Sequence, residues 1–72
     1  MAFDYSKLRG RIVEKFGNQI AFSKAMNTSE STLSLKLCGK RTWKQSEICL
    51  AIKLLELSEN DIPDYFFTIK VQ

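Results

Sequence analysis

The sequence contains no histidine and only two cysteines among its 72 residues. Cys38 and Cys49 lie eleven positions apart, which suits neither a disulfide framework nor a zinc site. Without an imidazole there is no Ser–His or Cys–His pair, and the three glycines form no phosphate-cradling loop. We therefore expect a binding protein and not an enzyme, with no cofactor, no metal and reduced cysteines that act as small apolar side chains.

Long apolar runs are also missing. No stretch approaches the roughly 18 residues that a membrane span requires, and the first residues do not have the pattern of a secretory signal. A chain of 72 residues is expected to form one domain over 1–72, whose thin core leaves no room for a deep small-molecule site. These absences predict a cytoplasmic protein without a membrane or small-molecule partner.

Positive charge is concentrated in the first part of the chain. Residues 1–44 carry nine Lys or Arg against three Asp or Glu, a net charge of +6, whereas residues 45–72 carry two against five, a net charge of −3. A basic half of this kind suits a polyanionic partner. An ordinary solvated surface would have the same composition, so the charge pattern leaves both interpretations open.

The spacing of apolar residues predicts an all-α fold of five helices. Helical periodicity covers about 4–16, 18–26, 29–38 and 43–57, and Pro63 suits the start of a short fifth helix. Asp4 and Ser29 are expected to cap helix starts, and Thr42 with Gln45 fits a capping box. In the tail, 68–72, alternating apolar residues indicate an extended segment.

The aromatic residues are expected to belong to the core. Trp43 is predicted to pack between helices and not to stack on a base. The run of Tyr65, Phe66 and Phe67 is predicted to close the domain, with self-association as the alternative.

The segment 18–38 has the features of a helix-turn-helix. Asn27 tolerates a positive φ and can turn the chain between two helices. Leu33 and Leu37 are four residues apart and share a face toward the core, which directs Leu35 outward. The pattern predicts a motif that presents its second helix to a partner.

These residues resemble the Cro/CI-type helix-turn-helix family of phage regulators, whose domain consists of five helices and is about as long as this chain. With Glu47, Ile48 and the aromatic run at 65–67, the chain looks more narrowly like small regulators of Gram-positive phages. The matching positions in the motif are Gln19, Phe22, Ser23, Met26, Asn27, Thr28, Ser29, Thr32, Leu33, Ser34, Lys36, Leu37, Gly39, Lys40 and Arg41.

The resemblance implies which side chains would meet a partner. In the family, the front of the second helix of the motif reads base edges in the major groove. The equivalent positions here are Glu30, Ser31, Ser34 and Leu35. Contacts to phosphate would come from Gln19, Lys36, Lys40, Arg41 and Lys44.

Two of the base-reading positions do not suit DNA recognition. Glu30 turns a negative charge toward a polyanion, and Leu35 can touch only a thymine methyl group. The resemblance also implies another role, a modulator of the lysis–lysogeny switch that binds the CI-type phage repressor inside the bacterial host. Glu30 would mimic a phosphate and Leu35 would anchor the contact. We expect such an antirepressor, with possible DNA contact in the complex; the alternative is a Cro-like repressor that binds operator DNA alone.

Overall fold

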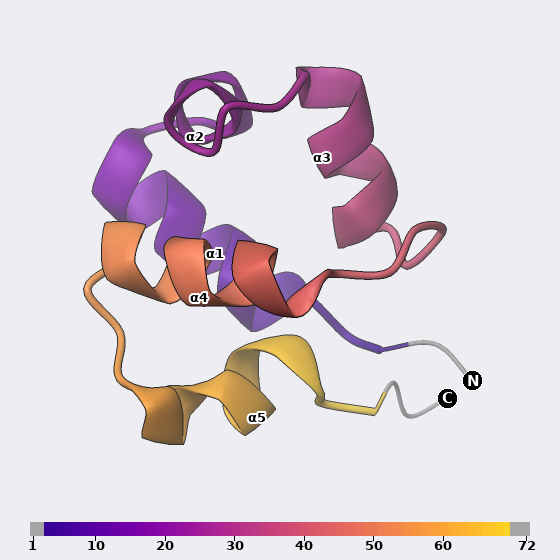
Figure 1. The fold of residues 1–72 in the computed structure, drawn as a ribbon, viewed down its shortest axis with the longest axis vertical. Helices are drawn as coiled ribbons and strands as arrows, with labels where there is room; N and C mark the ends of the chain where they lie inside the picture. Colours follow the sequence, from indigo (N-terminus) through magenta and orange to yellow (C-terminus); the bar gives the residue numbers. More distant parts are fainter. Residues whose placement is uncertain (1–2, 70–72) are drawn as a thin grey trace.

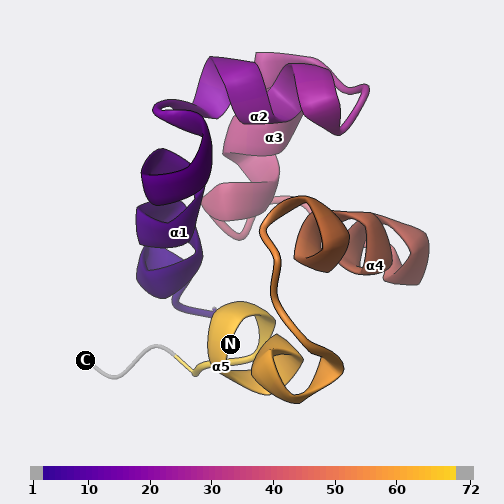
Figure 2. The ribbon, with the colours of Figure 1, turned by 90° about the vertical axis from the view of Figure 1, so that its left-hand side faces the viewer.

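The computed structural model describes residues 3–69, and within them the predicted all-α fold of five helices is confirmed. In Figure 1 and Figure 2, α2 lies across one end of α1 and α3, with α4 and α5 toward the other end. Residues 70–72 of the tail predicted to be extended lie outside the described residues, but Ile69 pairs with Phe3 in a single antiparallel bridge. The elements are α1 (Ser6–Phe16), α2 (Gln19–Ala25), α3 (Glu30–Leu37), α4 (Gln45–Leu54), the 3-10 helix η1 (Glu59–Asp61) and α5 (Ile62–Phe66).

A side chain of the preceding residue caps the start of α2 and of α3. The side chains of Asn18 and Ser29 each accept a hydrogen bond from the N–H three residues later, at 2.8 and 3.1 Å. Such an acceptor satisfies one of the unpaired first N–H groups of a helix. The cap predicted at Asp4 is wrong, because α1 begins at Ser6 with Tyr5 as its N-cap residue and no side-chain cap; Asp4 accepts a hydrogen bond from the Ser6 N–H at 2.9 Å from one position further back.

The predicted start of α4 is wrong. The helix begins at Gln45 and not at Trp43, and Thr42 does not form the predicted capping box with Gln45. Instead Glu47 accepts a hydrogen bond from the Lys44 N–H at 2.8 Å. A carboxylate at the third helical position is long enough to reach back to this N–H group.

One hydrogen-bond pattern ends α2, α3 and α4. Asn27, Gly39 and Glu56 adopt φ values of 58, 80 and 56°. The N–H of the residue after each one donates to the carbonyl five positions earlier, at 3.0, 2.9 and 2.8 Å. This left-handed ending turns the chain sharply and satisfies a carbonyl at the helix end. The turn predicted at Asn27 is confirmed, whereas α4 ends earlier than predicted.

The core forms where the inner faces of the helices meet. Leu33 and Leu37 are buried as predicted. Two apolar residues next to core residues are exposed. Val13 lies about 100° round the α1 axis from buried Ile12, and Phe67 comes directly after the last residue of α5. The core residues are Tyr5, Leu8, Ile12, Phe22, Met26, Leu33, Leu37, Ile48, Ala51, Ile52, Leu55 and Phe66.

Two arginines of α1 bind the ends of other helices. The Arg9 guanidinium donates to the Leu37 carbonyl at 3.0 Å, and Nε of Arg11 donates to the Leu55 carbonyl at 3.1 Å. Both carbonyls belong to helix ends, where a cation also interacts favourably with the helix dipole. Part of the positive charge in residues 1–44 therefore stabilises the fold and is not directed at a partner.

A buried ion pair joins α3 to α4. Lys36 is only 7% exposed; its ammonium donates to Glu47 and lies 5.9 Å from the centroid of the Trp43 ring. Partial burial acts to raise the pKa of Glu47, but the hydrogen bonds from Lys36 and from the Lys44 N–H, together with the positive charges of both lysines, outweigh it. The pKa of Glu47 is therefore lower than that of an ordinary glutamate.

We predict that Asn27→Ala lowers the free energy of unfolding by about 1 kcal/mol, because alanine lacks the tolerance of asparagine for a left-handed conformation. Asn27→Gly, which meets no such penalty, should stay within about 0.5 kcal/mol of the unchanged chain. Urea unfolding measures both values. Equal stability of the two variants would contradict the assigned turn.

We predict that Glu47→Gln destabilises the fold by about 1–3 kcal/mol at pH 7, because the Lys36 ammonium stays buried without its charged partner. The pKa of Glu47 is lowered by folding, so the pair stabilises the fold above about pH 4.3, the usual pKa of glutamate. This stabilisation is lost as the pH falls through the folded pKa.

Urea unfolding of Glu47→Gln and of the unchanged chain, at pH 7 and at pH 3, measures this effect. The difference between their free energies of unfolding should be smaller at pH 3 than at pH 7. Glu14→Gln, which removes a more exposed ion pair with Arg11, should cost at most about 1 kcal/mol. If the loss of unfolding free energy caused by Glu47→Gln is the same at both pH values, the ion pair is contradicted.

Candidate partner-binding surface

The predicted reading positions form one exposed strip of α3. Glu30, Ser31 and Leu35 are exposed, Leu35 to 37%, and Ser34 is half-buried. At about 100° per residue, Glu30 and Leu35 lie about 140° apart round the helix axis, with the two serines between them. Glu30 and Leu35 therefore lie on opposite edges of the strip. They are not neighbours, so they cannot form a single contact point.

Gln19 lies where this strip meets α2. Its Oε1 atom accepts a hydrogen bond from the Ser34 hydroxyl at 3.4 Å, and the side chain is half-buried at the first position of α2. The structure thus brings Gln19 to the edge of the strip. Its contact with phosphate stays a prediction.

A basic groove borders the strip beyond Leu35. Thr32, which lines it, lies about 60° further round the α3 axis from Leu35. All four basic residues predicted to contact phosphate line this groove. The groove is lined by Thr28, Thr32, Lys36, Lys40, Arg41, Thr42, Lys44 and Glu47.

The four basic residues of the groove are not equivalent. Lys40, Arg41 and Lys44 are exposed, and no ion pair within residues 3–69 involves them. Lys36 is buried and paired with Glu47, so the structure does not support its predicted contact with phosphate. The groove therefore offers three cations to an anionic group.

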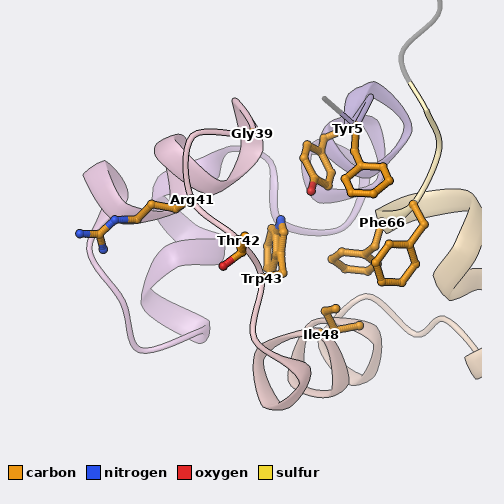
Figure 3. Close-up of a pocket in the computed structure, with 9 residues that line it drawn as sticks. Tyr5, Gly39, Arg41, Thr42, Trp43, Ile48 and Phe66 are labelled. Carbon is orange, nitrogen blue, oxygen red and sulfur yellow. The ribbon is translucent and has the colours of Figure 1, made fainter. Parts of the chain in front are cut away.

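An exposed aromatic surface, which the sequence did not predict, lies on the other side of the loop 38–44. Figure 3 shows its central pocket, where the Trp43 and Phe66 rings lie 5.1 Å apart. At its rim, Phe3 and Phe67 lie 5.7 Å apart and are 38% and 49% exposed. The pocket is lined by Phe3, Tyr5, Gly39, Arg41, Thr42, Trp43, Ile48, Phe66 and Phe67.

A second pocket extends this surface along α4 to the start of α5. It shares Trp43, Ile48 and Phe67 with the first pocket and adds Gln45, Cys49 and Ile62. We call the two pockets with their rim the aromatic surface. The three consecutive aromatic residues at 65–67 are the one sequence feature that could have indicated an exposed ring, because a short helix can bury only one of its sides.

Trp43 packs between the rings of Tyr5 and Phe66, as predicted, with centroid distances of 6.4 and 5.1 Å. Its Nε1 atom is buried and has no hydrogen-bond partner among residues 3–69. Burial also raises the pKa of the Tyr5 hydroxyl. The indole is thus a wall of the aromatic surface and not a ring presented to a nucleic acid base.

The loop between α3 and α4 separates the groove from the aromatic surface. Arg41 and Thr42 line both, and Figure 3 shows the Arg41 side chain directed away from the aromatic rings. One short segment therefore presents apolar groups on one side and positive charge on the other.

Among the described residues, none of the helices is long and apolar enough to cross a membrane. Residues 3–69 also contain no cluster of three or more His, Cys, Asp or Glu side chains that could hold a metal ion.

Two comparisons with known proteins found a match. The family described as "Protein of unknown function (DUF739)" matches residues 1–69, and no curated protein matches. A solved structure, that of the modulator of repression (MOR) of the temperate bacteriophage TP901-1 from Lactococcus lactis, is 54% identical in sequence. The match covers 100% of this chain and 97% of that chain, with a TM-score of 0.82. The chain therefore belongs to the DUF739 family and is homologous to a phage modulator of repression.

Proposed function

We propose that this chain is an antirepressor that binds a CI-type phage repressor and modulates repression through that contact. The observation that carries the proposal is the aromatic surface beside the loop that follows α3. Exposed aromatic clusters of this kind mark protein-binding sites, and Trp and Tyr are frequent among the residues that dominate binding energy. The homology to a modulator of repression supports a repressor as the partner.

The exposed strip of α3 also favours a protein over DNA. Glu30 would repel a phosphate backbone, and Leu35 offers no hydrogen bond to a base edge. Toward the basic DNA-reading surface of a repressor, both features become favourable. Glu30 would pair with a cation there, and Leu35 would pack against apolar stems of long side chains.

The mechanism that follows is competition for the repressor's DNA-binding surface. A repressor whose reading helix is covered by α3 and by the aromatic surface cannot place that helix in the major groove. If instead the repressor stays on its operator, Lys40 and Lys44 could add phosphate contacts within the complex. Both routes need a protein–protein contact first.

We predict that Phe67→Ser weakens binding to the repressor's N-terminal domain at least tenfold, because it removes an exposed ring at the rim of the aromatic surface. Leu35→Ala should weaken it three- to tenfold. Calorimetric titration of the repressor domain with each variant measures these changes.

The matched control is Val13→Ser, which removes an exposed apolar side chain from α1 that lines neither pocket. It should leave the affinity within twofold. If Phe67→Ser and Leu35→Ala have no larger effect than this control, neither surface carries the proposed contact.

A Cro-like repressor that binds operator DNA alone is the second candidate, and the three cations of the groove favour it. Three phosphate contacts predict a slope near −3 for log affinity against log salt, much shallower than the slope near −5 expected for six. We therefore predict weak operator binding by the chain alone.

The charge of Glu30 separates the two candidates. Glu30→Lys should strengthen operator binding and weaken repressor binding, because it replaces a phosphate mimic with a cation. Fluorescence anisotropy with an operator duplex, run beside the repressor titration, measures both. Tight operator binding by the unchanged chain, with a slope near −5, would favour the Cro-like function.

A further inference from the structure

We propose that the basic groove binds a carboxylate-bearing segment of the partner protein that the aromatic surface engages. The partner would then present an apolar side chain to the aromatic surface and an acidic one across the loop 38–44. This inference rests on the proposed function and names the chemistry that the partner must offer.

Charge complementarity is the first argument, because the groove holds most of the positive charge that the fold leaves unpaired. Outside the groove, Lys7, Arg11 and Lys15 of the first half form ion pairs with acidic side chains, and inside it Lys36 is paired with Glu47. Arg9 donates to the end of α3. The unpaired cations of the groove therefore create a local positive potential that attracts an anionic group.

The types of donor fit a carboxylate. Arg41 carries a planar guanidinium that can donate two parallel hydrogen bonds to one carboxylate, and Lys40 and Lys44 add ammonium donors. The hydroxyls of Thr28 and Thr42 line the same groove. A carboxylate placed there would meet both charged and neutral donors.

The position of the groove favours a protein carboxylate over a DNA phosphate. The aromatic surface shares Arg41 and Thr42 with the groove, and an apolar patch has nothing to offer a sugar-phosphate backbone. A protein segment can fill both at once, with an acidic residue in the groove and an apolar residue on the aromatic surface. Glu47 also lines the groove, where its negative charge is paired with the Lys36 ammonium.

The test is titration of the repressor's N-terminal domain with charge variants of the full chain. Arg41→Glu should weaken binding at least tenfold and Arg41→Gln at least threefold, since the first adds repulsion and the second only removes a cation. The difference in repressor affinity between each variant and the unchanged chain should become smaller as salt rises from 50 to 300 mM, because salt screens exposed charges.

Lys24→Glu is the matched control. Lys24 lies on α2, is exposed, forms no ion pair within the described residues and does not line the groove. This variant changes the net charge by the same amount and should alter the affinity less than threefold. Circular dichroism verifies that each variant keeps its helices.

The outcomes separate the two proposals. If the unchanged chain binds the repressor and Arg41→Glu weakens binding no more than Lys24→Glu does, the groove proposal fails and the proposed function stands. If Arg41→Glu abolishes binding to an operator duplex while repressor binding is kept, the groove is a DNA site and the carboxylate proposal is overturned. If the unchanged chain does not bind the repressor at all, both proposals fail.

Discussion

The ion pair between Lys36 and Glu47 is the interaction on which the partner-facing part of the molecule depends. It is the polar link between α3 and α4, and it lies against the face of Trp43. Because Glu47 also holds the Lys44 N–H, the pair fixes where α4 begins and hence where the loop after α3 ends. The groove, the loop and the aromatic surface are all arranged around this point.

Charge in this small chain has two separate uses. Arg9 and Arg11 bind the ends of α3 and α4, where their charge satisfies backbone carbonyls. Lys40, Arg41 and Lys44 are left on the surface beside the strip of α3. The surface is therefore mixed in character, with an acidic edge at Glu30, apolar groups and one basic groove.

The sequence was sufficient for local features whose cause is also local. Asn27 turns the chain because asparagine tolerates a positive φ, and Ser29 caps α3 with an oxygen three residues away from its donor. Leu33 and Leu37 point inward because their spacing matches the helical period. Each of these depends on a few neighbouring residues.

The features that the sequence did not reveal depend on distant partners. Nothing in the sequence distinguishes Lys36 from the other lysines of the motif, because its partner Glu47 lies eleven residues further along the chain. Phe67 looked like core because it is aromatic, but the chain leaves α5 just before it and turns it outward. The aromatic surface combines residues near both ends of the chain with Trp43, and no local pattern encodes such a combination.

In the proposed function, the chain acts on repression through the repressor and not through its own recognition of DNA. Gel-shift experiments on the operator DNA of the switch test it most directly, with the chain alone, the repressor alone and the two together. The account predicts no shift by the chain alone at concentrations where it alters the repressor's shift, and no such alteration by Phe67→Ser. A specific shift by the chain alone, with the mixture giving only the sum of two independent shifts, would contradict it.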